Sequence, residues 1–460
     1  MDDVQRSQTA PKDVVERLRA TFDSGRTRPL QWRVGQLRAL ERMLTEREAE
    51  FAEALSKDLG RSPFDAVLLD LASTRAEIRH ALGNLTSWAR PRSVRAPLGT
   101  RPGRAWYQYE PLGVVLIIGP WNYPVHLVLA PLVAAIAAGD CAVLKPSEVT
   151  PSCAAVLAET VPEYLDPDAF AVVEGAADVT LGLLDQAPDH CFFTGSPGVG
   201  SAVMTAAARH LIPVTLELGG KCPVIVTASA RHDVAARRVV FGKLLNSGQT
   251  CVAPDYVLVD RRVRDDFVAE LVASIRAFSE GDDLPIVNRR HAARLAGLLA
   301  DAGGSTVLGG GVDVESARAE MTVVVDPDPG SPLLREEIFG PILPVVTVES
   351  LDEAIAHVRR GTSPLAGYLF TEDRQDEKRV LARITTGATV VNHVMMHLGV
   401  NDLPFGGVGT SGMGKYHGRW GFEALSNPKA VLRKPSRPDF RLMYPPYGPL
   451  ARRLMRTLLG

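Results

Sequence analysis

Cys251 stands in the stretch GQTCVAP, residues 248 to 254, between a glycine-bearing turn and a proline. A cysteine attacks as the thiolate, so catalysis by this side chain requires an access path and a partner that favours ionisation. A free thiol with a pKa of about 8.5 is only slightly ionised at neutral pH, yet it is strongly nucleophilic. Whether Cys251 reacts or only packs therefore depends on residues elsewhere in the chain.

Glu217 is the first candidate partner. The stretch PVTLEL, residues 213 to 218, alternates apolar and polar side chains, which predicts a strand that turns Glu217 away from its apolar face. Gly219 and Gly220 follow and permit a tight corner. A carboxylate in a partly apolar cleft has a raised pKa and can take a proton from water. Glu217 is therefore a candidate general base, and the alternative is an exposed glutamate on a strand.

Asn122 follows the apolar run VVLII in an irregular loop, GPWNYP. Its amide can donate a hydrogen bond to an oxygen that gains negative charge, and removal of one such donor costs about 2.7 to 4 kcal/mol of transition-state stabilisation. Asparagine is also a common turn residue, so a plain turn is the alternative.

Gly195 and Gly200 lie in FFTGSPGVG, where an apolar run enters a glycine turn that a small-residue helical segment follows. A strand, a glycine turn and a helix N-terminus together bind the pyrophosphate of a dinucleotide. The spacing is not G-x-G-x-x-G, so an ordinary strand-to-helix turn is the alternative. Lys145 and Glu148, in VLKPSE, come just after another apolar run. They suit ribose hydroxyls at a sheet edge, or they form a solvated surface pair.

Two series of short apolar runs predict the elements that position these residues. Such runs, separated by helix-length segments, indicate parallel sheets covered on both faces, and therefore an α/β fold. The second series predicts a second α/β domain. The first series comprises 114–118, 142–144, 191–193 and 224–226, and the second comprises 257–259, 323–325, 342–346 and 388–391.

The first hundred residues are predicted to be helical. Apolar residues recur at helical spacing, and Gly60 follows them as a stop signal. Arg47 and Glu48 interrupt this stripe once within the predicted helix. The stretch 90–103 is rich in Pro, Gly and Arg, which favours an extended arm or loop between domains. The members of the stripe are Leu37, Leu40, Leu44, Phe51 and Leu55.

Length and charge restrict the class of protein. A chain of 460 residues suggests two or three domains. Lys and Arg number 51 against 53 Asp and Glu, a net charge of -2, so nucleic acid is not an expected partner. The polar, acidic N-terminus is unlike a signal peptide, and the longest apolar run, 127–138, is too short to cross a bilayer.

The five cysteines form no C-x-x-C pair and no metal-ligand spacing. This pattern predicts reduced thiols in a cytoplasmic protein and no metal site. The cysteines other than Cys251 are expected to pack as small hydrophobic side chains. They stand at positions 141, 153, 191 and 222.

Seven segments occur in order between about residues 110 and 418: EPLGVVLIIGPWNYP, LKPSE, FFTGSPGVG, LELGGK, GQTCVAPDY, REEIFGPILPV and LPFGGVGTSGMGKYHG. Together they resemble the signature segments of the aldehyde dehydrogenase superfamily. GQTCVAPDY and PFGGVGTSGMGKYHG are similar to its class 3 and fatty aldehyde dehydrogenase branch. The resemblance implies a Rossmann-type cofactor domain, a second α/β catalytic domain and a small oligomerisation arm.

The resemblance also implies where these domains lie. It places the NAD(P)-binding domain at 1–89 and 114–216, the catalytic domain at 217–400, bridging and oligomerisation segments at 90–113 and 401–440, and a C-terminal tail at 441–460. It further implies a homodimer.

The resemblance implies a role for each candidate. Cys251 matches the nucleophile that attacks the aldehyde carbon, and Asn122 with the Cys251 N–H matches the pair that holds the oxyanion. Glu217 matches the general base that hydrolyses the thioester to the acid. The substrate is then an aliphatic medium- or long-chain aldehyde or an aromatic one, and the cofactor is NAD or NADP. Cofactor contacts are implied for Trp121, Lys145, Glu148, Gly195, Gly200, Glu337 and Phe339.

Three alternatives stay open at this point. A cysteine hydrolase would pair Cys251 with a histidine such as His393, His397 or His417. A CoA-acylating dehydrogenase would release the thioester to CoA, and a non-catalytic relative would only bind ligands. The first leaves the glycine turn unexplained, and Glu217 in the hydrolytic position argues against the second.

Two stretches depart from the pattern of the branch. Compared with the class 3 pattern, the chain looks shorter around residues 277–295, which implies a trimmed surface loop or helix there. The tail after YPPY ends in a short segment in which leucines oppose arginines, which fits contact with a membrane surface, and the alternatives are a solvated tail or one packed on a neighbouring subunit. The leucines are Leu450, Leu454 and Leu458, and the arginines are Arg452, Arg453 and Arg456.

Overall fold

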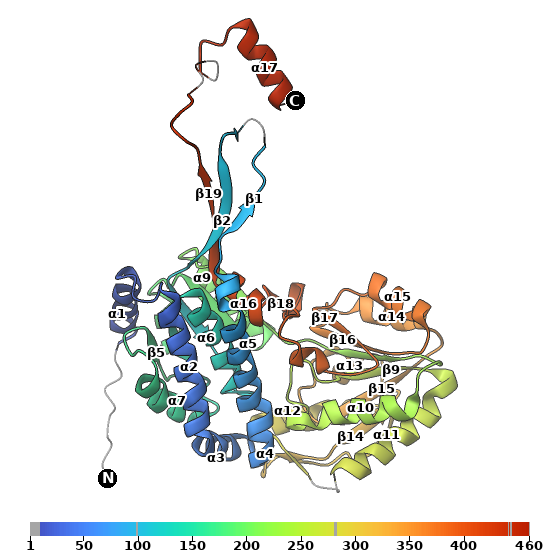
Figure 1. The fold of residues 1–460 in the computed structure, drawn as a ribbon. Helices are drawn as coiled ribbons and strands as arrows, with labels where there is room; N and C mark the ends of the chain where they lie inside the picture. The colour runs from blue at the N-terminus through green and yellow to red at the C-terminus, as the bar shows by residue number, and fades with distance from the viewer. Residues whose placement is uncertain (1–9, 98–99, 280–282, 440, 442–443, 460) are drawn as a thin grey trace, which may run out of the picture.

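The computed structural model describes residues 10–97, 100–279, 283–439, 441 and 444–459. Two lobes, each containing a sheet and helices, lie side by side, and a long arm rises above them (Figure 1). Helix α17 (Pro449–Leu459) lies beyond the tip of this arm. The arrangement confirms the predicted α/β class.

The first lobe is built on a six-stranded sheet in the order β18-β7-β6-β3-β4-β5. All neighbours are parallel except β18, which pairs antiparallel with β7. The chain leaves β3 towards one side of the sheet and β6 towards the other, which opens a crevice at their carboxyl ends. The strands are β3 (Val114–Ile118), β4 (Cys141–Lys145), β5 (Phe170–Val172), β6 (His190–Thr194), β7 (Val214–Glu217) and β18 (Gly412–Met413).

The second lobe contains a seven-stranded sheet in the order β11-β14-β15-β9-β8-β16-β17, with β11 as the antiparallel edge. The run 224–226, which the sequence grouped with the first series, forms β8 in this second sheet. The strands are β8 (Pro223–Val226), β9 (Tyr256–Asp260), β11 (Ser305–Leu308), β14 (Thr322–Val325), β15 (Ile342–Val348), β16 (Ala366–Phe370) and β17 (Ala388–Val391). A small separate sheet comprises β10 (Leu284–Pro285), β12 (Val312–Asp313) and β13 (Arg318–Ala319).

Helices cover both sheets. Those of the first lobe are α1 (Pro11–Asp23), α2 (Leu30–Glu46), α3 (Glu48–Leu59), α4 (Pro63–Ala66), the π-helix η1 (Val67–Ala72), α5 (Ser73–Trp88), α6 (His126–Ala138), α7 (Pro151–Tyr164), α8 (Ala177–Leu184), α9 (Pro197–Ala208) and α16 (Gly418–Ala424). Those of the second lobe are α10 (His232–Leu244), η3 (Leu245–Gly248), η4 (Arg261–Val263), α11 (Arg264–Ser279), α12 (Arg289–Ala300), α13 (Pro332–Arg335), α14 (Leu351–Arg360) and α15 (Arg374–Arg383). Two 3-10 turns, η5 (Met396–Gly399) and η6 (Gly409–Ser411), lie in the segment that returns to the first lobe.

The predicted helix over the apolar stripe at 37–55 is two helices, α2 and α3, so the prediction of one helix was wrong. They meet at Arg47, whose φ of -104° and ψ of 19° end α2. The Arg47 guanidinium forms ion pairs with Glu50, Glu159 and Glu163, which keep the junction of the two helices at the surface. Gly60 ends α3 in the left-handed region at φ 66°, as predicted.

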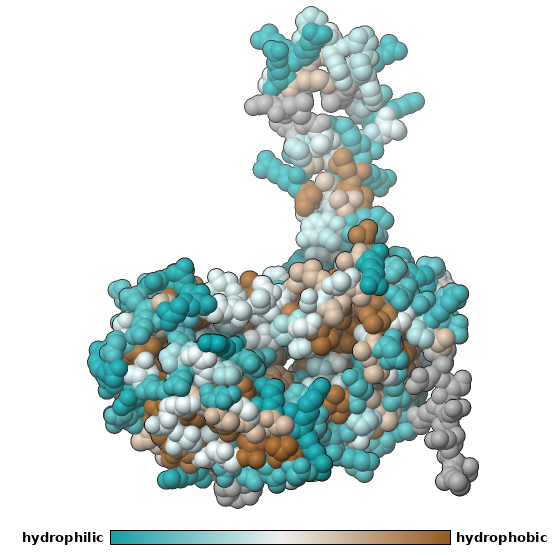
Figure 2. Space-filling model, turned by 180° about the vertical axis from the view of Figure 1, so that it is seen from behind, coloured by the Kyte–Doolittle hydropathy of each residue, from teal (hydrophilic) through white to brown (hydrophobic). Residues whose placement is uncertain are grey.

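The arm is a three-stranded antiparallel sheet of β1 (Arg92–Val94), β2 (Arg104–Pro111) and β19 (Ser426–Arg433). The stretch 90–103, predicted as loop or extended chain, contributes β1, and residues 98 and 99 lie outside the described residues. Hydrophobic side chains appear on the arm (Figure 2), and Val94 and Leu432 are exposed apolar residues of its strands. The arm therefore presents uncovered apolar surface.

Helix α6 contains the whole of the longest apolar run, 127–138, and its residues after His126 are buried against the first sheet and its neighbouring helices. Gly139 ends the helix in the left-handed conformation, at φ 96°. Among the helices of the described residues, none combines the length and apolar character that crossing a bilayer requires.

Candidate functional site

A cavity of about 1070 Å³ is lined by residues of both lobes and lies at the carboxyl ends of β3, β4, β6 and β7. It brings together nine of the predicted site residues: Trp121, Asn122, Lys145, Glu148, Gly195, Glu217, Cys251, Glu337 and Phe339. Gly200 lies inside α9, where a Cβ would sit 2.6 Å from Leu218 Cδ2. Helix packing thus explains this glycine, and its contact with pyrophosphate stays a prediction.

Cys251 is presented by an unusual turn. Asn246, in η3, adopts a left-handed backbone conformation at φ 52°, which redirects the chain after α10. The Thr250 hydroxyl lies 2.7 Å from the Tyr123 hydroxyl, so the residue before the cysteine is tied to the first lobe. Cys251 itself is partly exposed, whereas the other four cysteines are buried. The thiol therefore has the access path that a nucleophile requires.

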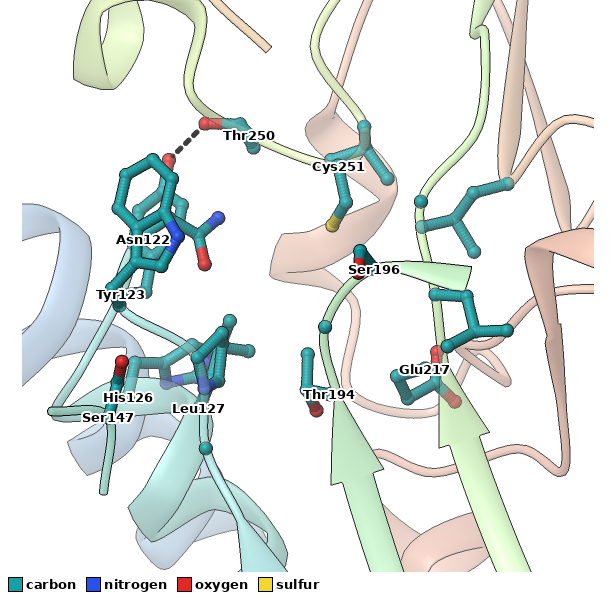
Figure 3. Close-up of a pocket in the computed structure, with 18 of the residues that line it drawn as sticks. Asn122, Tyr123, His126, Leu127, Ser147, Thr194, Ser196, Glu217, Thr250 and Cys251 are labelled. Carbon is teal, nitrogen blue, oxygen red and sulfur yellow. Dashed lines mark hydrogen bonds between the residues drawn. The ribbon is translucent and has the colours of Figure 1, made fainter. Parts of the chain in front are cut away.

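Figure 3 shows the Cys251 Sγ directed into the cavity, with Asn122 on one side and Glu217 on the other. Asn122 is only 4% exposed, and its Nδ2 donates to the backbone oxygen of Gln249 at 3.1 Å. A side-chain amide carries two N–H donors, so this bond leaves one for a ligand. The amide is therefore anchored to the chain segment that carries the cysteine.

A buried ion pair contacts the loop that carries Asn122. Arg61 pairs with Asp70, and it also donates to the backbone oxygen of Asn122. Asp70 lies in the π-helix η1 and accepts the N–H groups of Val125 at 3.0 Å and His126 at 2.7 Å. Sequence reasoning missed this pair, because RSPFDAVLLD reads as an ordinary helix start with no catalytic spacing. A π-helix is itself a frequent mark of a functional region.

Glu217 ends β7 as a buried carboxyl, 2% exposed, rather than an exposed strand residue. Neither carboxyl oxygen has a hydrogen-bond partner within the described part of the chain. Burial raises the pKa of Glu217 well above its usual range, and the positive charge of Lys415 opposes that shift. A carboxyl with a raised pKa suits general-base chemistry near neutral pH.

Burial also raises the pKa of the Cys251 thiol, to about 12, and the negative charges of Glu337 and Glu217 add to the shift. At neutral pH the thiol is therefore protonated in the ligand-free protein. Attack by sulfur then requires a group that removes the proton as the bond to carbon forms. Glu217 lines the same cavity and is a candidate for this group (Figure 3).

The nucleotide end of the cavity surrounds the crevice between β3 and β6. Lys145, at the end of β4, is 4% exposed and donates to Glu148 Oε2 at 2.9 Å, whereas the Glu148 side chain is exposed, so only the lysine of the pair is buried. At Gly195 a Cβ would sit 2.6 Å from the Phe193 ring, and Ser196 then caps α9. A glycine turn, a helix N-terminus and a buried ammonium group fit the phosphates and ribose of a dinucleotide.

Glu337 projects towards this crevice from the second lobe. Burial first, and then the charge of Asp255, raise its pKa to about 8. Gly219 makes room for it, since a Cβ there would lie 2.1 Å from Glu337 Oε2. Phe339 holds a positive φ of 48° and packs edge-on against Trp121, with ring centroids 5.3 Å apart. Glu337 Oε1 has no hydrogen-bond partner among the described residues, and a ribose hydroxyl would satisfy it.

A clamp fixes the backbone around Glu337. Arg294 donates to the Glu337 carbonyl oxygen at 3.2 Å, and the Ile338 N–H donates to Asp255 Oδ1 at 2.9 Å. Asp255 is in turn paired with Lys221. Asp255 lies in the segment GQTCVAPDY, Lys221 in LELGGK and Glu337 in REEIFGPILPV. These contacts therefore join three of the signature segments. Nothing in the sequence spacing indicated this connection.

The rest of the cavity is mainly apolar. The lining there includes Leu69, Leu127, Phe241, Leu245, Leu398 and Phe405. A polar contact lies in the same wall, where His417 Nδ1 is 3.1 Å from Glu77 Oε1. Burial raises the pKa of Glu77 to about 7 and lowers that of His417 to about 3. The space suits an extended or aromatic hydrocarbon.

The three histidines that a cysteine hydrolase would use are engaged elsewhere. His417 contacts Glu77, and the His397 ring stacks on Phe405 with centroids 6.1 Å apart. His393 Nδ1 lies 2.8 Å from the backbone oxygen of Val394. None of these contacts joins a histidine to Cys251.

Comparison with known proteins establishes the family. The profile of the Aldehyde dehydrogenase family matches residues 4–431. The chain is 45% identical to aldehyde dehydrogenase family 3 member B1 of Bos taurus, over 97% of this chain and 96% of that protein. It is 44% identical to family 3 member A2 of Rattus norvegicus, over 94% and 90% of the two chains. A structure described as the substrate-bound state of Staphylococcus aureus AldH superposes with a TM-score of 0.95 at 39% identity, covering 98% of this chain and all of that one (100%). The chain thus belongs to the aldehyde dehydrogenase family, in the branch of its family 3 relatives, and is an oxidoreductase that acts on aldehydes.

Proposed function

We propose that Cys251, Asn122 and Glu217 oxidise an aldehyde to its carboxylic acid through a thioester on sulfur. The single observation that carries this assignment is the placement of the Cys251 thiol between a buried amide and a buried carboxyl, all three lining one cavity (Figure 3). The roles below follow from that placement.

In the first half of the reaction, Cys251 Sγ adds to the aldehyde carbon while the thiol proton passes to Glu217. The carbonyl oxygen becomes an oxyanion that accepts hydrogen bonds from Asn122 Nδ2 and the Cys251 N–H. The carbon of this thiohemiacetal then loses hydride, and the carbonyl bond re-forms as a thioester. When bound, NAD or NADP supplies the acceptor for that hydride.

In the second half, Glu217 has returned its first proton to solvent and takes another from a water molecule. The resulting hydroxide adds to the thioester carbon, and the Cys251 thiolate leaves as the carboxylic acid forms. Both halves need Glu217 in its ionised form. Burial of the carboxyl works against that form, so any nearby positive charge matters for the rate.

The cofactor is NAD or NADP, held at the crevice between β3 and β6. Lys145 and Glu148 bind the adenine ribose, Gly195 brings the backbone close to the pyrophosphate, and Glu337 binds the nicotinamide ribose. Phe339 and Trp121 flank the nicotinamide side. This assignment rests on the close approach at Gly195, the buried Lys145 and the unpartnered oxygen of Glu337.

The substrate is a medium- or long-chain aliphatic aldehyde or an aromatic one, because the remaining cavity wall is mainly apolar. Hydrolysis, rather than transfer to CoA, follows from a buried carboxyl placed beside the thiol. Adding CoA to the reaction and measuring acyl-CoA distinguishes the two outcomes, and we expect the free acid.

The assembly is a homodimer formed through the arm. Its strands stand clear of both lobes and expose apolar residues, which favours pairing with a second copy (Figures 1 and 2). The free cysteines support a cytoplasmic location. In α17, Leu450 and Leu454 are exposed beside Arg452 and Arg453, which favours peripheral contact with a membrane surface. The predicted contribution of the Leu458 side chain lies outside the described residues.

Glu217→Gln tests the proposed mechanism. This variant keeps the shape of the side chain but cannot take a proton from water, so the thioester should form slowly and persist. Quenching the reaction and measuring the mass of the protein should reveal an acyl group on Cys251. A variant that turns over and deacylates at the normal rate would remove Glu217 from the mechanism.

A further inference from the structure

A loop from near the end of the chain covers the general base. Strand β18 pairs antiparallel with β7, with Gly412 opposite Glu217, and the Leu218 N–H donates to the Ser411 oxygen at 3.2 Å. Phe405 and Tyr416 exchange two backbone hydrogen bonds, of 3.0 and 2.8 Å. Residues 405–416, here called the cover loop, are therefore held rigidly against the strand that carries Glu217.

Lys415 is anchored within this cover loop. Its Nζ donates to the backbone oxygens of Gly406 and Gly407, the second at 3.2 Å, and the side chain is only partly exposed. A Cβ at Gly406 would lie 2.8 Å from Glu217 Oε1 and 3.0 Å from Lys415 Cδ. The lysine stem and the carboxyl oxygen thus approach the same point, and a glycine leaves the space between them free of a side chain.

The electrostatic surroundings of Glu217 contain three titratable neighbours: Lys415, Cys251 and Tyr416. Burial raises the pKa values of the thiol and of the phenol, so both are neutral at neutral pH. Lys415 is the cation of this group: burial lowers its pKa and the charge of Glu217 opposes that shift, while the charge of Lys415 in turn opposes the rise that burial causes in the pKa of Glu217. Within the described residues the Glu217 oxygens have no hydrogen-bond donor to stabilise their charge.

We propose that Lys415 is a positioning residue that keeps Glu217 in its charged, proton-accepting form by holding an ammonium group beside it. This inference rests on the general-base role of Glu217 proposed above. The lysine acts through Glu217 and contacts neither substrate nor sulfur in the proposed reaction.

The physical reason is the cost of an isolated carboxylate in a buried site. Removal from water disfavours the charged form, and an opposite charge a few ångströms away lowers a carboxyl pKa by about 1 to 3 units. Lys415 is suited to this purpose because two carbonyl oxygens fix its ammonium group while part of the side chain stays in solvent. Without that charge Glu217 would be protonated over more of the neutral range.

The test measures deacylation separately from hydride transfer. p-Nitrophenyl acetate acylates a thiol by releasing nitrophenol, which gives an initial burst, and later turnover then reports hydrolysis of the thioester. Lys415→Gln keeps a donor for the Gly406 and Gly407 oxygens but removes the charge, whereas Lys415→Arg keeps the charge. Lys378→Met, at an exposed site on α15, removes a positive charge elsewhere and is the matched control.

We expect Lys415→Gln to move the acid limb of the deacylation pH profile upward by about one unit. At pH values below the pKa of Glu217, deacylation should be roughly tenfold slower than in the natural protein at the same pH. The reason is that a rise of one pKa unit lowers the ionised fraction of the carboxyl tenfold. The burst amplitude should stay that of the natural protein. Lys415→Arg should retain the original limb, and Lys378→Met should leave it unchanged.

An unshifted limb in Lys415→Gln would overturn the proposal, as would equal shifts in Lys415→Gln and Lys415→Arg, which would indicate a structural role for the side chain. Glu217→Gln distinguishes failure of the underlying mechanism. If Glu217→Gln deacylates with the natural profile, the general-base role itself is wrong. If Glu217→Gln abolishes the limb while Lys415→Gln leaves it in place, only the role of Lys415 is wrong.

Discussion

At the scale of residues, one cause shapes the ionisation of three groups around the reacting sulfur. Burial raises the pKa of Cys251, of Glu217 and of Glu337, the first to about 12 and the last to about 8. All three groups therefore favour their neutral forms before the reactants arrive. Chemistry at this site depends on nearby donors and cations that stabilise the charged forms when they are needed.

Asn122→Ala removes the proposed side-chain donor to the oxyanion. We expect kcat for aldehyde oxidation to fall by about 100- to 1000-fold, the loss that follows removal of one such donor. KM should change far less, because the donor acts on the charge of the transition state. Tyr123→Phe is the control, since it removes only the hydroxyl that contacts Thr250. Equal losses in the two variants would argue against a specific role for the amide.

Glu337→Ala removes the carboxyl proposed to bind the nicotinamide ribose. Loss of one charge-assisted contact costs roughly 1.5 to 3 kcal/mol, so KM for the cofactor should rise by about 10- to 100-fold. Initial rates at varied cofactor concentration measure this change. Glu336→Ala alters the exposed neighbour and should have little effect. Unchanged cofactor kinetics in Glu337→Ala would contradict the contact.

Sequence motifs indicated the residues that we propose to react, whereas the residues that support them in the structure could not be predicted. Cys251, Glu217 and Asn122 lie in short segments that can be recognised from the sequence without knowledge of the fold. Arg61 and Asp70 approach the same site from a helical region far away in sequence, and only tertiary packing brings them there. For Gly200, the glycine-rich motif predicted contact with a ligand. In the structure this glycine instead allows helix α9 to pack closely on Leu218.

At the scale of elements, the π-helix η1 and the turn η3 position the two sides of the reaction site. Asp70 in η1 accepts backbone N–H groups at the start of α6, and Asn246 in η3 donates to the Asn122 oxygen at 3.0 Å. Neither irregular element follows from periodicity, which favours regular helices. The break between α2 and α3 at Arg47 appeared in the sequence as an interruption of the apolar stripe. The ion pairs that Arg47 makes with helix α7 could not be predicted from that interruption.

Asp70→Asn separates the stabilising and positioning roles of the buried ion pair. Removing one partner should lower the free energy of unfolding by about 3 to 5 kcal/mol, because a buried charge is left unpaired. The double variant Asp70→Asn with Arg61→Met should recover much of that stability but not kcat, since the Asn122 loop has lost its anchor. Denaturant unfolding and steady-state kinetics measure the two effects. Full recovery of kcat in the double variant would contradict a positioning role.

At the scale of the whole molecule, two lobes supply opposite walls of the cavity. The first lobe contributes Asn122 and Glu217, and the second contributes Cys251 and Glu337. Short apolar runs predicted two sheets, since buried parallel strands have a strong sequence signal, although the run 224–226 was assigned to the wrong one. The return of β18 to the first sheet had no such signal, because two residues, Gly412 and Met413, are too few to show a period.

Deletion of residues 449–460 tests the proposed membrane contact of α17. The full chain should cosediment with vesicles that contain anionic lipid, because exposed leucines and arginines suit such a surface. The truncated chain should bind less, while its aldehyde oxidation and its oligomeric state stay unchanged. Vesicles of neutral lipid provide the control for the charge contribution. Equal binding by the full and truncated chains would contradict the proposed membrane contact of α17.

The most direct test of the account replaces the sulfur. Cys251→Ala should bind NAD or NADP as the natural chain does but produce no reduced cofactor from an aldehyde, and its mass should stay unchanged after quenching. Cys153→Ala, at a buried thiol of α7, should retain turnover. Reduced cofactor formed at an undiminished rate by Cys251→Ala would contradict the claim that this thiol carries the reaction.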